Sequence, residues 1–167
     1  MAIFEASRPH MPHYGLLGPG EGRGLLPWAW ADARLAACRN YWLSTVCDDG
    51  APHAMAVWAV WHRDALFFST DGASRKARNL KRDPRCVVTT ESAAEAVVVE
   101  GRAAIERDAA LLGDVATRYR AKYEMGYPDR SEVYRVTPAV VFGFIEDASE
   151  FTGTATRWRA VGAGRRR

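Results

Sequence analysis

The sequence predicts a mainly β domain, an antiparallel β-barrel with helices attached to it. Short segments rich in β-branched and aromatic residues dominate residues 41–106, and turn signals such as Asp48-Asp49-Gly50 separate them. Hairpins therefore connect most neighbouring strands, which argues against a doubly wound α/β sheet. The chain also contains no Gly-x-Gly-x-x-Gly or Walker-type loop, so neither a Rossmann nor a P-loop nucleotide site is expected.

The composition excludes several classes of protein. The net charge of +3 is too small to indicate nucleic-acid binding, and no apolar run approaches the roughly 20 residues of a membrane helix. We find no signal peptide and expect a cytoplasmic protein. Cys38, Cys47 and Cys86 are far apart, which favours reduced thiols over disulfides. We expect an N-terminal arm over residues 1–26, a barrel domain over 27–160 and a tail over 161–167.

The barrel domain begins with a helix and a pair of strands. Pro27 suits the start of a helix that continues to about Arg39. Strands are predicted over Tyr41–Cys47 and Pro52–His62. Both faces of the second strand are largely apolar, so both must be covered. One face can line the barrel core, whereas the other needs a partner chain, a helix or a flat ligand.

The remaining elements follow from the same signals. Gly101 indicates a β-bulge within its strand, and Asp108 is a good N-cap for a long helix that buries one apolar stripe. In chain order we expect a strand over 65–70, a helix over 74–82, strands over 85–91 and 95–106, a helix over 108–125, and strands near 132–137, 140–147 and 152–160.

The short helix that begins after Ser74 carries the clearest chemical signal. Arg75, Lys76 and Arg78 lie in its first turn, where the helix dipole disfavours a cation by about 0.3–1 kcal/mol. Cations beside free backbone N–H groups form a good anion site, to which Ser69, Thr70 or Ser74 would add a hydroxyl. The alternative is a basic surface helix that pairs with neighbouring acids, and at this stage the two interpretations have similar weight.

Other candidate residues are less specific. Trp58 and Trp61 are candidate stacking partners for a flat ring, although a core role explains either of them. His53 and His62 are candidate proton donors, but solvated positions explain them equally well. No Ser/His/Asp arrangement, paired carboxylates or metal-ligand spacing stands out, so we assign no catalytic and no metal-binding residue.

Several motifs in order resemble the pyridoxamine 5′-phosphate oxidase-like split β-barrel superfamily. They are Leu43-Ser44-Thr45-Val46-x-x-Asp49-Gly50-x-Pro52-His53, Val57-Trp58-x-x-Trp61, Leu66-Phe67-Phe68-Ser69-Thr70, Ser74-Arg75-Lys76-Ala77-Arg78-Asn79-Leu80-x-x-Asp83-Pro84-Arg85 and Val97-Val98-Val99-Glu100-Gly101-Arg102-Ala103. The resemblance is strongest over residues 28–107. Its specificity comes from the combined order and spacing of the motifs.

The resemblance implies a six-stranded split barrel that forms a homodimer with two cofactors at the interface. It implies that the strand around Met55 lies against the cofactor ring, that the strand end at Thr70 contacts the ribityl-phosphate region, and that Arg75 and Lys76 bind the phosphate. The positions that it assigns to the cofactor are Met55, Ala56, Val57, Trp58, Ser69, Thr70, Ser74, Arg75, Lys76 and Asn79.

Two departures from the true pyridoxamine phosphate oxidases argue against vitamin B6 oxidation. The C-terminal Arg-Leu-x-Pro ending is absent, and no arginine lies near Met55. The pattern is more similar to flavin and deazaflavin oxidoreductases, which implies coenzyme F-420 or, less favoured, FMN, and hydride transfer with a small unsaturated or carbonyl substrate. The alternatives are a non-catalytic flavin or F-420 carrier, and a haem-binding protein with His53 or His62 as axial ligand.

Overall fold

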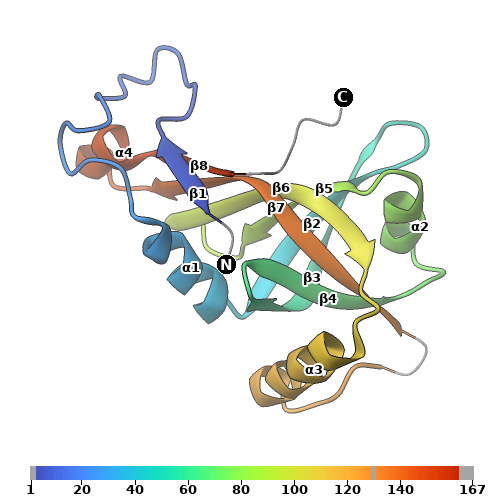
Figure 1. Ribbon diagram of the computed structural model, residues 1–167. Coiled ribbons are helices and arrows are strands. Elements are labelled where there is room, and N and C mark those ends of the chain that lie inside the picture. The colour runs from blue at the N-terminus through green and yellow to red at the C-terminus, as the bar shows by residue number, and fades with distance from the viewer. Residues whose placement is uncertain (1–2, 129–130, 162–167) are drawn as a thin grey trace.

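Among the residues that the structure describes, eight antiparallel strands form one sheet that closes on itself (Figure 1). The computed structural model describes residues 3–128 and 131–161. The strand order is β1-β8-β7-β4-β3-β2-β5-β6, and pairing of β6 with β7 closes a barrel of six strands, β2 to β7. This confirms the predicted six-stranded antiparallel split barrel. The elements are β1 Phe4–Ser7, α1 Trp28–Ala37, β2 Asn40–Val46, β3 Pro52–His62, β4 Ala65–Asp71, α2 Arg75–Arg82, β5 Arg85–Thr90, β6 Glu95–Ile105, α3 Ala109–Tyr123, β7 Ser131–Ile145, α4 Ala148–Thr154 and β8 Thr156–Ala160.

Strand β3 pairs with a different strand in each half of its length, and the barrel is split at the point where the pairing changes. Its first half pairs with β2, from Pro52 opposite Val46 to Trp58 opposite Asn40. Its second half pairs with β4, from Ala59 to His62. Because β4 then diverges to pair with β7, the first half of β3 keeps one edge without a strand. Backbone groups along that edge are available to a ligand.

Strand β7 runs unbroken from Ser131 to Ile145, so the prediction of two strands in this region was wrong. A β-bulge explains the continuity. Glu100 of β6 lies opposite Val140 and Gly101 opposite Pro138, which leaves Ala139 as the extra residue on β7. Proline is tolerated within a sheet at such a bulge, because the ladder is already interrupted there. The register shift occurs at Gly101, where a bulge was predicted, but the extra residue is on β7 and not on the strand of Gly101.

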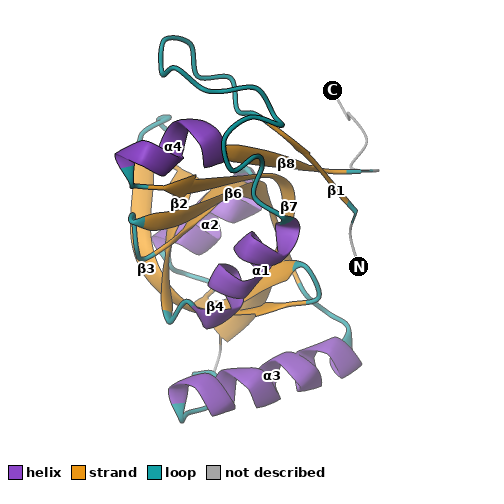
Figure 2. Cartoon of the chain, turned by 90° about the vertical axis from the view of Figure 1, so that its left-hand side faces the viewer, coloured by secondary structure: helices purple, strands orange, loops and turns teal. Residues whose placement is uncertain are grey.

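Helices cover the barrel at separate places (Figures 1 and 2). In Figure 1, α1 lies at one end of the barrel and α2 at the other, while α3 lies below β3 and β4. The core is continuous beneath α1, where Trp28 stacks on Phe4 at 3.8 Å between ring centroids and meets the edge of Trp158 at 5.8 Å. Helix α3 covers the outward-facing Val60 and Phe67, so it supplies part of the predicted second cover of β3.

The two ends of the chain differ from prediction. Residues 4–7 of the predicted arm form β1, which pairs with β8. Residues 152–154, predicted to begin the last strand, belong instead to α4, whose N-cap Asp147 accepts a hydrogen bond from the backbone N–H of Ser149 at 2.8 Å. Of the predicted tail, residues 162–167 lie outside the described part of the chain.

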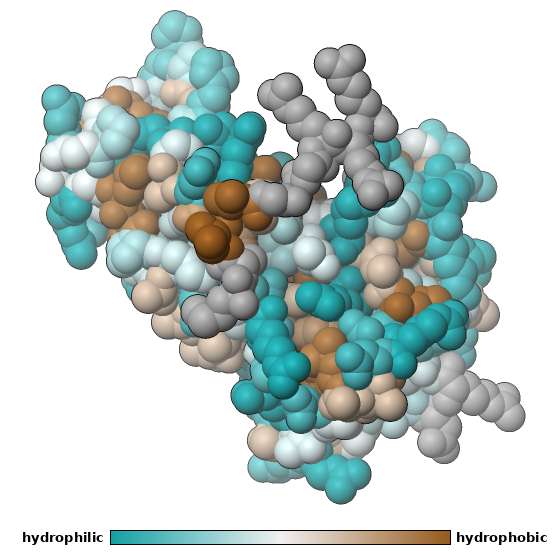
Figure 3. All heavy atoms as spheres, in the orientation of Figure 1, coloured by the Kyte–Doolittle hydropathy of each residue, from teal (hydrophilic) through white to brown (hydrophobic). Residues whose placement is uncertain are grey.

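Hydrophilic side chains cover most of the face seen in Figure 3, and hydrophobic ones form small patches between them. Among the described residues, none of the helices combines the length and the hydrophobicity that a membrane crossing requires.

We predict that Gly101→Ala lowers the free energy of unfolding by about 1–3 kcal/mol, a typical cost of overpacking. A Cβ at this position would lie 2.5 Å from the carbonyl oxygen of Thr137, which is backbone and cannot easily move. Gly113→Ala in α3 is the control, because its Cβ would meet nothing within 4 Å. The free energy of unfolding of the control should rise by about 0.5–1 kcal/mol, because alanine has a higher helix propensity than glycine. Urea denaturation measures both, and equal shifts in the same direction would contradict the packing argument.

Candidate cofactor-binding site

Helix α2 begins where β4 ends, and two hydroxyl groups fix its first turn. The Ser74 side chain accepts a hydrogen bond from the backbone N–H of Ala77 at 3.2 Å, which confirms it as the N-cap. The hydroxyls of Thr70 and Ser74 lie 2.9 Å apart and share a hydrogen bond. Ser69 precedes Thr70 and is half-buried. The sequence-predicted hydroxyls therefore lie together at the start of this helix.

Five of the eight residues of α2 are cationic, and no acid lies in its first turn. Three of the five have partners: Lys81 pairs with Glu132 at 3.2 Å, while Arg78 and Arg82 donate to backbone carbonyls. Arg75 and Lys76 have no hydrogen-bond or ion-pair partner among the residues that the structure describes. The two predicted phosphate-binding cations are thus the two unpaired cations of this helix.

A pocket of about 360 Å³ lies between α2 and the turn that joins β2 to β3. Arg75, Arg78 and Arg82 line one side of it, at helical positions i, i+3 and i+7 that share a face. Asp48 and Asp49 of the turn line the other side, and Lys76 does not contribute. Arg82 was not predicted as a site residue, although the spacing of the three arginines on the predicted helix contained the signal.

Asn79 joins α2 to the start of β3 through a chain of polar side chains. Its side chain is buried and donates to the hydroxyl of Thr45 at 2.9 Å. The same hydroxyl lies 3.5 Å from Nδ1 of His53. The Asn79 side chain lines the arginine pocket, but its amide N–H groups already hold Thr45 and the Cys47 sulfur. Its main contribution in this structure is to position α2 against β2.

The four predicted ring-contacting residues lie along the part of β3 that has a free edge. Val57 is buried in the barrel, whereas Met55 is 46% exposed although its partner Leu43 is buried, because β4 has already diverged. Ala56 and Trp58 are exposed on the opposite, outer face. None of the four lines the arginine pocket.

Trp58 is held by α3. Its ring stacks on Tyr123 at 4.9 Å between centroids with an interplanar angle of 5°, and 47% of the residue stays exposed. The Tyr123 hydroxyl accepts from the backbone N–H of Ala59 at 2.9 Å and donates to the carbonyl of Arg39. Burial raises the pKa of Tyr123 to about 12, so this hydroxyl keeps its proton at neutral pH. Trp61, by contrast, is buried in the core and donates to Asp32 at 2.7 Å.

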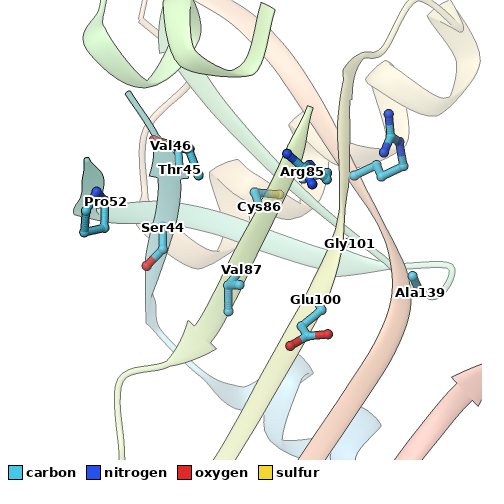
Figure 4. A pocket seen from close by; sticks show the side chains of 11 residues that line it. Ser44, Thr45, Val46, Pro52, Arg85, Cys86, Val87, Glu100, Gly101 and Ala139 are labelled. Carbon is cyan, nitrogen blue, oxygen red and sulfur yellow. The ribbon is translucent and has the colours of Figure 1, made fainter. Parts of the chain in front are cut away.

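A larger cavity of about 580 Å³ lies on the outer face of β2, β5 and β6 (Figure 4). None of the predicted cofactor residues lines it. It meets the site only through Thr45, whose hydroxyl binds Asn79, and through Val46, whose carbonyl binds Arg82. We therefore locate the candidate site by its chemistry, at α2 and the free edge of β3, rather than by cavity size.

The profile of the pyridoxamine 5′-phosphate oxidase family matches residues 29–144, most of the chain and all six barrel strands except the last residue of β7. The chain belongs to this family. Within the family barrel, the start of α2 and the free edge of β3 hold the residues that were predicted from the sequence as cofactor contacts, and their role in binding stays a prediction. No curated protein shows significant similarity to the chain.

Solved structures share the fold at low identity. A conserved hypothetical protein from Mycobacterium tuberculosis aligns with a TM-score of 0.65 at 23% identity, over 74% of this chain and 87% of that one. An F-420 reductase aligns with a TM-score of 0.52 at 22% identity, and the alignment covers 66% of this chain and 94% of that one. The haem storage protein HutZ from Vibrio cholerae aligns with a TM-score of 0.54 at 18% identity, and the alignment covers 64% of this chain and 85% of that one. The family fold therefore includes an F-420 reductase and a haem protein.

We predict that Tyr123→Phe lowers the free energy of unfolding by about 1–3 kcal/mol, because it leaves the Ala59 N–H and the Arg39 carbonyl without their partner. The ring stack with Trp58 is retained. Tyr119→Phe is the matched control, since Tyr119 is equally buried on the same helix and has no hydrogen bond from its hydroxyl among the described residues. Chemical denaturation should separate the two variants, and an equal loss in both would refute this assignment.

Proposed function

We propose that this protein is an oxidoreductase that binds coenzyme F-420, or less favourably FMN, and transfers a hydride between that cofactor and a small unsaturated or carbonyl substrate. The observation that carries the proposal is the pair of unpaired cations, Arg75 and Lys76, beside the Thr70 and Ser74 hydroxyls. A bound phosphate would relieve the repulsion within α2 and accept several charge-assisted hydrogen bonds. The family membership supports a phosphate-bearing cofactor at this position.

The residues present fit such a cofactor. Ser74, Arg75 and Lys76 would hold the phosphate, and Ser69 and Thr70 the ribityl region next to it. The free edge of β3 offers unpaired backbone N–H and C=O groups to the polar edge of a flat ring, and Met55 offers an exposed apolar side chain beside them. A ring that binds along Met55, Ala56, Val57 and Trp58 would bury apolar surface and satisfy backbone groups together.

The arginine row on α2 favours F-420 over FMN. Arg75 to Arg82 spans seven residues, or about 10 Å along the helix. FMN ends at one phosphate, whereas F-420 continues beyond its phosphate into a tail of carboxylates. A row of three guanidinium groups matches an extended anion better than a single phosphate. Asn79 would not donate to the cofactor. Its hydrogen bond to the Thr45 hydroxyl would position α2, and with it the three arginines, against β2.

The proposed mechanism uses the protein for binding and orientation. A reduced flavin-type ring would supply the hydride when bound, as cofactors of this kind do. The residues of β3 would orient the ring, the start of α2 would hold the phosphate, and Trp58 would exclude water from one side. His53, half-buried beside Thr45, could supply a proton, and solvent is the alternative source.

A homodimer is part of the proposal. The outer face of β2 and β3 presents an exposed apolar surface in matched pairs, with Trp42 opposite Ala56 and Val46 opposite Pro52. Trp42 is 50% exposed and Trp58 47%, on neighbouring strands. Surfaces of this kind usually meet a partner. A second copy on this face would enclose the cofactor between two chains.

The alternative is a non-catalytic carrier of a flavin, of F-420 or of haem. The fold that this chain shares with HutZ makes haem a specific alternative. His53 lies near the candidate site and is the axial ligand to test, because His62 lies at the opposite end of β3 beside Asp114. A Soret band on haem addition, lost in His53→Ala, would favour haem over the proposed cofactors.

We predict that the double variant Arg75→Ala/Lys76→Ala weakens F-420 and FMN binding by about 100-fold or more, because two charge-assisted bonds are lost. The matched control is Arg107→Ala/Arg120→Ala, which removes the same charge from exposed side chains near and on α3. A fluorescence titration with each cofactor measures binding, and circular dichroism checks the fold. Unchanged affinity in the first variant would refute the phosphate assignment.

We also predict that Arg78→Gln/Arg82→Gln weakens F-420 binding by at least about tenfold more than FMN binding, since only F-420 reaches the second and third arginine. The same titration measures it, with unfolding curves to account for the lost backbone contacts of both arginines. Equal losses for the two cofactors would show that the row does not contact a tail.

A further inference from the structure

A third cavity lies away from the candidate cofactor site, between α1, α3 and the last residues of β3. Its volume is about 380 Å³, within the range of small-molecule sites. Ala36 and Ala37 of α1, Val60 and Trp61 of β3 and Ala121 of α3 form a wall of apolar side chains. It shares no lining residue with the arginine pocket at α2.

The polar groups of this cavity are two cations, Arg118 and Lys122, one turn apart on α3. Among the residues that the structure describes, no acid lines the cavity, although Glu91 lies near enough to Lys122 to favour its charged form. Arg118 is exposed and has no hydrogen bond or ion pair among the described residues. Asp114, one turn earlier, pairs with Arg63 at 2.9 Å instead. The guanidinium group is therefore available to an anion.

Lys122 lines the cavity, and contacts with its neighbours fix its ammonium group. Its ammonium group donates to the carbonyl of Ala59 at 2.8 Å and to the Tyr41 hydroxyl at 3.3 Å, and it lies 4.8 Å from the centre of the Tyr41 ring. These contacts use two of its three N–H donors. Burial lowers the pKa of Lys122 to about 8, so the group is still mainly protonated at neutral pH. A half-buried cation with a remaining donor binds an anion more strongly than an exposed one does.

We infer that this cavity binds an organic monocarboxylate with a short apolar tail, its carboxylate between Arg118 and Lys122 and its tail against the alanine, valine and tryptophan wall. A bare phosphate or sulfate would leave the apolar wall uncovered, and an uncharged alcohol would leave the Arg118 guanidinium group without an anion. Only a small amphipathic anion matches both the wall and the charges. The site is independent of the proposed cofactor, because none of its residues belongs to α2 or to the free edge of β3.

Hexanoate is the probe, with hexanol and hexylamine as controls for chain length, and the protein needs no added cofactor. Alanine methyl labelling and NMR titration report directly on Ala36, Ala37 and Ala121. We expect saturable shifts at these methyls with hexanoate, affinity at least about tenfold lower for hexanol, and no saturation with hexylamine. Equal affinity for hexanoate and hexanol, or no saturable shift, would overturn the inference.

Two variants test separately whether hexanoate binding needs the charge of Arg118 and whether it needs the volume of the cavity. Arg118→Gln should weaken hexanoate binding by about tenfold through loss of one charge-assisted bond. Ala121→Phe fills the exposed cavity while every charge remains, and should weaken binding at least as much. Arg120→Gln removes an arginine on the same helix that does not line the cavity, and should change affinity less than about twofold. Binding that is unaffected by both test variants would place hexanoate elsewhere and overturn the site.

Discussion

The exchange of neighbours along β3 is the constraint on which the candidate site depends. Pairing with β2 ends at Trp58 and pairing with β4 begins at Ala59, so each half of the strand lacks a neighbour on one edge. Helix α3 closes the edge of the second half, where the Tyr123 hydroxyl bridges the Ala59 N–H and the Arg39 carbonyl in place of the next ladder step. Nothing described in the structure closes the edge of the first half. The two free edges of β3 therefore differ. The Tyr123 hydroxyl binds the backbone at the edge of the second half, whereas the edge of the first half stays open.

Electrostatic strain in α2 supports the same location by an independent route. An eight-residue helix with five cations and no acid in its first turn is unfavourable by itself, because dipole and charges have the same sign. Its neighbours relieve only part of this, since Glu132 reaches Lys81 while backbone carbonyls occupy Arg78 and Arg82. The residual charge lies at the helix start, beside two hydroxyls. That arrangement adds nothing to the stability of the protein, and the anionic ligand that we propose would account for it.

The sequence predicted the fold well where local signals are strong. Strand β3, the Ser74 and Asp108 caps and the position of the bulge at Gly101 were read correctly, because each depends on a few adjacent residues. The sequence failed where the decisive contact is distant. Strand β1 forms only by pairing with β8, and Pro138 stays inside β7 only because the bulge at the neighbouring Ala139 interrupts the ladder with β6. Arg75 and Lys76 could be predicted from helix electrostatics, whereas the stack of Trp58 on Tyr123 joins residues 65 positions apart and has no local signal. The role of the predicted residues in binding a cofactor remains a prediction.

The two ligand sites that we propose lie near opposite ends of β3, and each has cations on a neighbouring helix. The start of this strand faces α2 through His53, Thr45 and Asn79, and its end faces α3 through Ala59 and Lys122. Unpaired cations therefore lie near both ends of one strand, at Arg75 and Lys76 and at Arg118, although the net charge of the chain is only +3. Small anions are attracted to both ends over about one Debye length, roughly 8 Å at physiological ionic strength. In both proposals, the apolar stretch between these ends would select among such anions, because only a ligand with an apolar or flat aromatic part can contact it. A modest net charge thus conceals a surface suited to amphipathic anions.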